Sequence, residues 1–240
     1  MYPVLFRSVD TYYVIWTAAL ALALLWTVRR LPLYGVDDDE GRRVIGWGFF
    51  GMLVGARAFE YIGNFSVYWR EPALLFDLNR GGLAEVGAFC GAFLTTATLC
   101  RRNSAVPFIG LCGAGAIPAC FAIVLGRWGC FFAGCCVGVP SALPWALHFP
   151  YDPEGVTRHP TQLYYSLAAA VTLALLLLVE KRALRLQRSL VAPLGVLLYA
   201  VMRFSIDPLR ADSGVGFSHY ALFAALPIAA WLLSRSPKAR

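Results

Sequence analysis

Seven long apolar segments alternate with short polar connections along this chain. Each segment is a continuous apolar run of about 20 residues, the length that a helix needs to cross a bilayer core. A barrel strand would instead alternate apolar and polar residues over about ten positions. A helix also satisfies its backbone hydrogen bonds within the segment, as lipid requires. The pattern predicts an all-α, polytopic membrane protein with about seven transmembrane helices, at residues 12–29, 44–64, 84–100, 106–127, 163–180, 191–209 and 217–234.

Composition supports a membrane protein. Hydrophobic residues make up 59% of the 240 residues and charged residues only 15%, whereas a soluble domain carries about a quarter charged residues. The first segment keeps its small residues inside the apolar run and ends at Arg29-Arg30, so we expect a retained span rather than a cleaved signal. No linker is long enough to separate two folded parts, and we expect residues 1–240 to form a single transmembrane domain.

The net charge of +7 is distributed unevenly between the two sides of the predicted bundle. Thirteen of the 21 basic residues lie on the connections after segments one, three and five and on the C-terminal tail, and five lie on the opposite side. Basic residues are retained on the cytoplasmic side. The distribution predicts an N-terminus outside and a C-terminus in the cytoplasm. Topology therefore accounts for the positive charge, and nucleic-acid binding is not expected.

Two connections on the predicted outer side carry unusual residues. One spans about 64–82, and the other spans about 128–162 and is rich in Cys, Gly and Pro. Connections of this length are usually functional when they are ordered. Trp145, Phe149 and Tyr151 suit headgroup depth. The longer connection is therefore expected to form an outer-side arm.

Ionisable residues inside a span cost about 2.5–3.5 kcal/mol each on insertion scales and indicate function by default. Tyr199, Arg203, Asp207 and Arg210 fall on one stripe of the sixth segment. This stripe is expected to face the bundle interior, where Arg203 would donate to an anionic headgroup and Asp207 would orient it. The alternative is a structural Arg203–Asp207 pair that ties helices together.

The second and fourth segments carry further candidates. Arg57 and Glu60 share one face of the second segment, where a site role and an internal pair are equally favoured. The fourth segment ends in the glycine-rich run 126–138, which contains Arg127. Arg127 is a natural phosphate donor, and with Arg203 it could clamp a lipid phosphate from two helices.

Four stretches carry motifs that occur together in one family of membrane enzymes. They are Gly55-Ala56-Arg57, Gly81-Gly82-Leu83, Gly126–Gly138 continued by Pro144-Trp145 and Arg158-His159-Pro160-Thr161-Gln162-Leu163-Tyr164, and Tyr199–Arg210. In this set and order the chain resembles the prolipoprotein diacylglyceryl transferases, which move diacylglycerol from phosphatidylglycerol to the lipobox cysteine of a prolipoprotein.

The resemblance implies a multi-pass protein of the bacterial inner membrane with its N-terminus outside. It implies phosphatidylglycerol as the substrate, a prolipoprotein signal peptide as the acceptor and no cofactor, and we expect a monomer. The residues expected to bind the lipid phosphate are Arg57, Arg127, Arg203, Tyr199, Gly138 and Arg210.

The chain departs from the family motifs where acid or base groups are expected. The family histidine falls on Val86, an asparagine on Cys130, and two glutamates on Cys135 and Tyr165. The phosphate-binding arginines are kept. Candidates for the missing base include His148, and the catalytic candidates are Glu85, Cys130, Cys135, His159 and Asp207.

Three of the seven cysteines, Cys130, Cys135 and Cys136, lie on the predicted outer side. A disulfide, a nucleophile activated by Arg127, a metal site and simple packing are the alternatives. A disulfide from Cys130 requires the chain to bend after the helix. No Cys/His spacing matches a zinc site well, so no metal is expected. The other four, in apolar helices, are expected to pack: Cys90, Cys100, Cys112 and Cys120.

Two classes of function remain. The first is a phosphatidylglycerol-dependent diacylglyceryl transferase or a closely related lipid-dependent transferase. The second is a membrane thiol–disulfide protein or a non-catalytic lipid-binding relative. Lipid turnover favours the first, and a redox response of the outer cysteines without lipid turnover favours the second.

Overall fold

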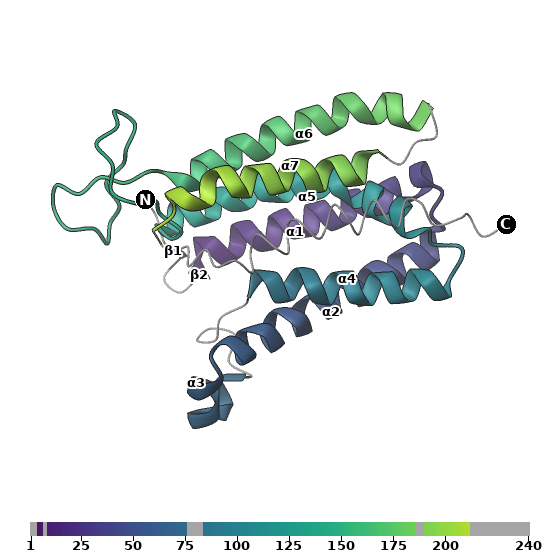
Figure 1. Cartoon of the computed structure of the whole chain (residues 1–240), viewed down its shortest axis with the longest axis horizontal. Coiled ribbons are helices and arrows are strands. Elements are labelled where there is room, and N and C mark those ends of the chain that lie inside the picture. Colours follow the sequence, from purple (N-terminus) through teal and green to yellow (C-terminus); the bar gives the residue numbers. More distant parts are fainter. Residues whose placement is uncertain (1–3, 7–8, 76–83, 186–189, 212–240) are drawn as a thin grey trace. The chain divides into compact units, whose positions relative to one another are not determined.

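The computed structural model describes residues 4–6, 9–75, 84–185 and 190–211. A short antiparallel pair of strands, β1 (Val4–Phe6) and β2 (Val9–Asp10), precedes the first helix. The predicted all-helical fold is confirmed (Figure 1). The α-helices are α1 (Thr11–Arg30), α2 (Asp38–Gly63), α3 (Phe65–Arg70), α4 (Glu85–Arg102), α5 (Phe108–Ala133), α6 (Thr161–Arg185) and α7 (Val191–Ile206), and the 3-10 helices are η1 (Leu31–Tyr34), η2 (Pro72–Leu75) and η3 (Asp207–Leu209).

Four described helical segments are long and apolar enough to span a membrane: Thr11–Tyr34, Phe108–Ala133, Thr161–Arg185 and Val191–Leu209. Helices α2 and α4 coincide with the predicted segments 44–64 and 84–100 but are not among these four. The predicted segment 217–234 lies outside the described residues. The number of seven spans therefore stays a prediction.

Helix α2 begins at Asp38, six residues before the predicted span. The Asp37 carboxylate accepts hydrogen bonds from the backbone N–H groups of Asp39 and Glu40 at 3.1 and 3.0 Å. This is an N-cap, which satisfies backbone donors that have no partner in the first helical turn. The polar first turn therefore extends the helix beyond its apolar run.

The described residues form two compact units, one made of those up to Tyr34 and from Cys112 onward, and the other of those between Gly35 and Leu111. The single domain expected over residues 1–240 stays a prediction.

The second unit is built on a close approach of α2 and α4. A Cβ atom placed on Gly91 would lie 2.0 Å from the Gly51 carbonyl oxygen, and one placed on Gly55 would lie 2.2 Å from the Gly87 carbonyl oxygen. Both helices therefore carry a glycine pair with three residues between its members. In membranes such pairs let helix backbones pack in direct contact.

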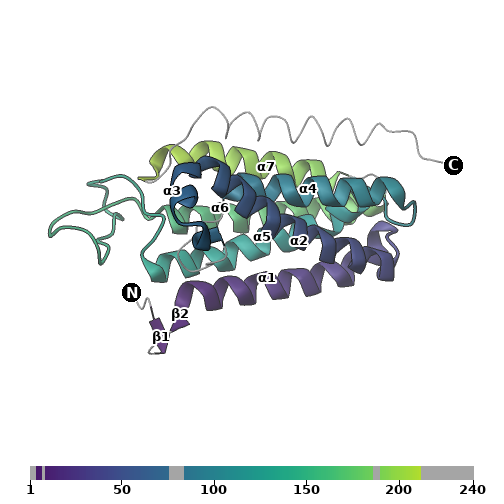
Figure 2. The ribbon, with the colours of Figure 1, turned by 90° about the horizontal axis from the view of Figure 1, so that it is seen from below.

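The first unit packs α1, α5, α6 and α7 side by side (Figures 1 and 2). Ile117, Leu176 and Val191 from three of these helices form a buried cluster, against which Trp26 of α1 packs. Apolar side chains from four helices therefore fill this part of the bundle interior.

A buried ion pair also joins this unit. Arg30 of α1 pairs with Glu180 of α6, and its Nε donates to the Ala114 carbonyl of α5 at 3.1 Å. The side chains of Arg30 and Glu180 are 7% and 10% exposed. The Tyr34 hydroxyl donates to the same carboxylate. Arg30, counted above among the cytoplasmic-side charges, is therefore an internal link between three helices.

The glycine contacts of the second unit give the first prediction. Gly91→Ala places a methyl group against the Gly51 carbonyl and should destabilise the fold by about 1–3 kcal/mol, the usual cost of overpacking. Gly46→Ala is the matched control, because nothing lies within 4 Å of its Cβ position. Thermal unfolding in detergent measures both. Equal melting temperatures for Gly91→Ala and wild type would contradict the close approach.

Candidate functional site

The centre of the candidate site is the aromatic ring of Tyr165 on α6. The Arg127 Cζ atom, from α5, lies 4.1 Å from the ring centroid, and the Arg203 Cζ atom, from α7, lies 5.9 Å from it. These distances are typical of cation–π contacts. Tyr165 is fully buried. Three helices thus bring the two predicted phosphate-binding arginines to one ring.

Asp207 links Arg203 to Tyr165. The Arg203 Nε atom lies 2.9 Å from Asp207 Oδ2 in an ion pair, and the Tyr165 hydroxyl donates to Oδ1. The Arg203 and Asp207 side chains are 5% and 4% exposed. The structural pair considered from the sequence is therefore present, and it orients Arg203. Because both carboxylate oxygens are engaged, this state of Asp207 suits positioning better than proton abstraction.

Arg127 differs from Arg203 in its partners. Its Nε–H is buried and has no hydrogen-bond partner among the described residues. Buried donors are nearly always satisfied, and each exception needs an explanation. An anionic oxygen from a bound ligand would satisfy this donor. Arg127 is therefore suited to ligand binding as well as to packing.

The connection between α5 and α6 folds back onto the end of the bundle. The Gly138 N–H donates to the His159 carbonyl at 2.9 Å, and the Val139 N–H donates to the Leu209 carbonyl at 2.8 Å. A Cβ atom on Gly138 would lie 2.5 Å from the His159 Cβ atom, so only glycine fits. Gly138 also forms an isolated antiparallel β-bridge with Arg210. The Gly138 amide is used inside the protein, and its lipid-binding role stays a prediction.

His159 contacts the hydroxyl of Tyr164 through its Nδ1 atom at 3.2 Å. The Trp145 indole donates to the same hydroxyl at 2.8 Å. His159 is half-buried, whereas His148 is exposed and its Nδ1 lies 2.9 Å from the Val156 carbonyl. Tyr164 therefore links the arm to the start of α6 and orients the His159 ring.

The first residues of α6 also hold the end of α5. The Thr161 hydroxyl donates to the Cys136 carbonyl and the Gln162 amide donates to the Cys135 carbonyl, both at 2.6 Å. Thr161 and Gln162 are fully buried. The motif segment 158–164 therefore fixes the turn at residues 134–136, called here the cysteine-bearing turn.

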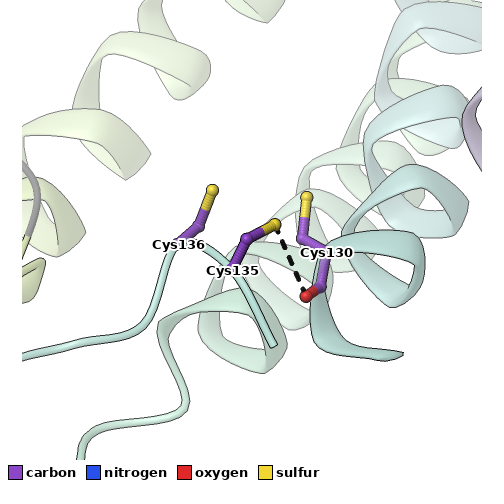
Figure 3. A group of neighbouring side chains, drawn as sticks. All are labelled: Cys130, Cys135 and Cys136. Atoms are coloured by element: carbon purple, nitrogen blue, oxygen red, sulfur yellow. Dashed lines mark hydrogen bonds between the residues drawn. The ribbon is translucent and has the colours of Figure 1, made fainter. Parts of the chain in front are cut away.

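The three outer cysteines gather at this turn (Figure 3). Helix α5 ends at Ala133, and positive φ angles at Gly134 (70°) and Cys136 (57°) bend the chain back. The sulfur atoms of Cys130, Cys135 and Cys136 lie within 4.8 Å of one another, and all three thiols are free. The bend that a contact with Cys130 requires is present.

The thiols of Cys135 and Cys136 are not activated in this state. Hydrogen bonding to the Cys130 thiol, together with burial, raises the pKa of both Cys135 and Cys136 above the ordinary cysteine value. A thiol with a raised pKa stays protonated at neutral pH. The nucleophile role, which requires a thiolate, is therefore disfavoured for these two residues without a further ligand.

The remaining candidates are placed as follows. Tyr199 is half-buried and packs against the cluster that contains Tyr165. Arg57 belongs to the second unit, where it donates to the Leu74 carbonyl and its Cζ lies 5.8 Å from the Tyr68 ring centroid. Its convergence with Arg127 and Arg203 stays a prediction. The side chain of Glu85, in the first turn of α4, lies outside the described part of the chain.

Comparison with known proteins gives a consistent match. The family model of the prolipoprotein diacylglyceryl transferases matches residues 3–234. Three relatives bear the name phosphatidylglycerol–prolipoprotein diacylglyceryl transferase. The one from Gloeobacter violaceus is 33% identical over 215 residues, covering 86% of this chain and 79% of the relative. Those from Pseudomonas fluorescens and Finegoldia magna are 31% and 27% identical, covering 88% and 84% of this chain and 80% and 79% of the relatives.

The Tyr165 contacts give the second prediction. Tyr165→Phe keeps the ring beside both arginines but removes the hydroxyl that donates to buried Asp207. We expect a loss of about 1–3 kcal/mol in the free energy of unfolding, because a buried acceptor loses a partner. Tyr151→Phe, at a side chain that is 77% exposed, should change little. Chemical unfolding measures the difference. If Tyr165→Phe has the same free energy of unfolding as the wild type, the contact between Tyr165 and Asp207 is contradicted.

Proposed function

The chain belongs to the prolipoprotein diacylglyceryl transferase family, and we propose that it transfers the diacylglyceryl group of phosphatidylglycerol to the cysteine thiol of a prolipoprotein signal peptide. The observation that carries this proposal is the family match over residues 3–234. The geometry at Tyr165 supports it, because two arginines from different helices meet there.

Arginine is suited to the lipid phosphate. Its planar guanidinium forms charge-assisted, often bidentate, hydrogen bonds with phosphate oxygens. The unpartnered Nε–H of Arg127 is free to donate to such an oxygen, while Asp207 holds Arg203 in position. In the reaction the acceptor sulfur forms a bond to the glyceryl carbon and the carbon–oxygen bond to phosphate breaks. Both arginines would stabilise the charge on the departing glycerol phosphate.

The acceptor thiol must lose its proton before it attacks. His159 is a candidate base, because it is half-buried and oriented by Tyr164. Glu85 is the other candidate, next to Val86, where the family motif places a histidine. General-base help is typically worth about 10²–10⁴-fold.

The site would face the outside of a bacterial inner membrane. The last turns of α1, α4 and α6 contain basic residues, including Arg29, Arg101 and Arg182. Basic helix ends favour the cytoplasmic side, whereas the cysteine-bearing turn lies between the end of α5 and the start of α6. The N-terminus outside, the C-terminus in the cytoplasm and a monomeric state belong to this proposal.

A direct assay tests the function. Purified protein is incubated with phosphatidylglycerol labelled in its diacylglyceryl group and with a lipobox peptide. We expect label on the peptide and release of glycerol phosphate, and a peptide with serine in place of its cysteine should remain unlabelled. A thiol–disulfide protein, the second candidate supported by the clustered sulfurs, would show redox-dependent thiol titres without lipid turnover.

The arginines give the third prediction. Arg127→Lys and Arg203→Lys should each lower the transfer rate by about 10- to 100-fold, since a point charge cannot replace a two-pronged donor worth about 1.5–3 kcal/mol. Arg102→Lys, at an exposed position on α4, is the control. Melting temperatures are measured in parallel to detect unfolding. No carboxylate partner of Arg127 is found among the described residues. If Arg127→Lys transfers lipid at the wild-type rate, Arg127 does not bind the phosphate.

A further inference from the structure

The cysteine-bearing turn has the dimensions of a metal site. The sulfur atoms of Cys130, Cys135 and Cys136 all lie within 4.8 Å of one another. In a tetrahedral zinc site with zinc–sulfur bonds of about 2.3 Å, two sulfurs are about 3.8 Å apart. Small side-chain rotations would close the difference. Three thiols supply three corners of the tetrahedron, and the fourth is left for an external ligand.

The backbone around these thiols is fixed from several directions. The Cys135 N–H donates to the Cys130 carbonyl at 3.1 Å, and α6 secures the carbonyls of Cys135 and Cys136 through Gln162 and Thr161. Cys136 adopts a φ of 57°, which is costly for a residue with a side chain. Strain of this kind is concentrated at functional sites. The turn thus holds the three side chains together at an energetic cost.

Two cationic side chains and an indole N–H lie near the three thiols. The Arg127 guanidinium interacts electrostatically with Cys130, and that of Arg210 interacts with Cys136. The Trp16 indole lies beside Cys130, yet its buried Nε1–H has no hydrogen-bond partner among the described residues. Metal-bound ligands commonly receive such outer hydrogen bonds. Two cations and one spare donor therefore surround a group that would be anionic with zinc bound.

We propose that Cys130, Cys135 and Cys136 bind a zinc ion whose open fourth position takes the acceptor thiol of the transfer reaction. Catalytic zinc sites keep such an open position, whereas structural sites are closed by four protein ligands. Cys135 and Cys136 are partly exposed, so a substrate can reach this corner. The role of the fourth position rests on the proposed function, whereas zinc binding itself rests on the geometry alone.

Zinc would supply the activation that the chain otherwise lacks at Val86 and Cys135. A thiol that coordinates zinc is deprotonated outright, and its proton passes to water. The zinc-bound sulfur then forms its bond to the glyceryl carbon as the carbon–oxygen bond breaks. Glycerol phosphate leaves with that electron pair and takes up a proton from solvent. No change of oxidation state occurs in this step.

Zinc binding is tested first on the reduced full-length protein in detergent, by equilibrium dialysis against zinc and by the sulfur-to-metal absorption of a cobalt-substituted sample. We expect one zinc ion per wild-type chain. Serine at any of the three positions should weaken binding by at least about tenfold, since outer partners alone are worth 10- to 100-fold. Cys100→Ser, a half-buried thiol of the second unit, is the matched control. Equal binding by all four variants would overturn the site.

The transfer assay then tests the open position. Chelator-treated wild-type protein should lose lipid transfer and recover it when zinc is added back. A full rate without zinc, or a full rate after Cys130 and Cys135 become oxidised to a disulfide, would overturn the role of zinc. If the zinc-loaded wild-type protein transfers no lipid, the proposed function fails instead, and the dialysis result still decides whether the metal site exists.

Discussion

Placing two guanidinium groups inside a membrane bundle is the constraint on which the first unit depends. A charged side chain at the centre of a bilayer is expensive, so each must find a partner within the protein. Arg203 obtains one from Asp207, four residues on at the start of η3, and Tyr165 donates to the other oxygen of that carboxylate. The partner of Arg127 is the face of the Tyr165 ring, over which its guanidinium group lies. These contacts require α5, α6 and α7 to meet at one level.

The arm between α5 and α6 satisfies a second requirement at the same end of the helices. Its backbone groups must be paired wherever they are buried. The N–H groups of Gly138 and Val139 donate to the carbonyls of His159 and Leu209. Side chains at the start of α6 donate to carbonyls of the cysteine-bearing turn. The motif residues Thr161 and Gln162 thus act on the site through the backbone, and this accounts for their complete burial.

The sequence predicted the helices and the polar stripe because both are local properties. Apolar runs placed α1 and α6 within a few residues at most ends, and helical periodicity put Arg203 and Asp207 on one buried face. Apart from the approach of Arg127 to Arg203, contacts between distant segments were not predicted. Arg30 and Glu180 lie 150 positions apart, and periodicity says nothing about which helices become neighbours. The sulfur cluster depends on two positive φ angles, one of them at a residue other than glycine, and no local pattern indicates that.

Three of the residues that depart from the expected family motifs, Cys130, Cys135 and Tyr165, belong to the first unit, whereas Val86 lies on α4 of the second unit. Cys130 follows Arg127 by one helical turn, Tyr165 carries both guanidinium contacts, and Gln162, one turn before Tyr165, binds the carbonyl of Cys135. Substitutions at residues that share partners in this way are expected to have non-additive effects on stability. By the motif resemblance, the two arginines match the family pattern, while two positions expected to carry carboxylates hold Tyr165 and Cys135. On the proposed function, this set would keep phosphate recognition and change how the acceptor thiol loses its proton, the step that a zinc-bound thiolate would take over.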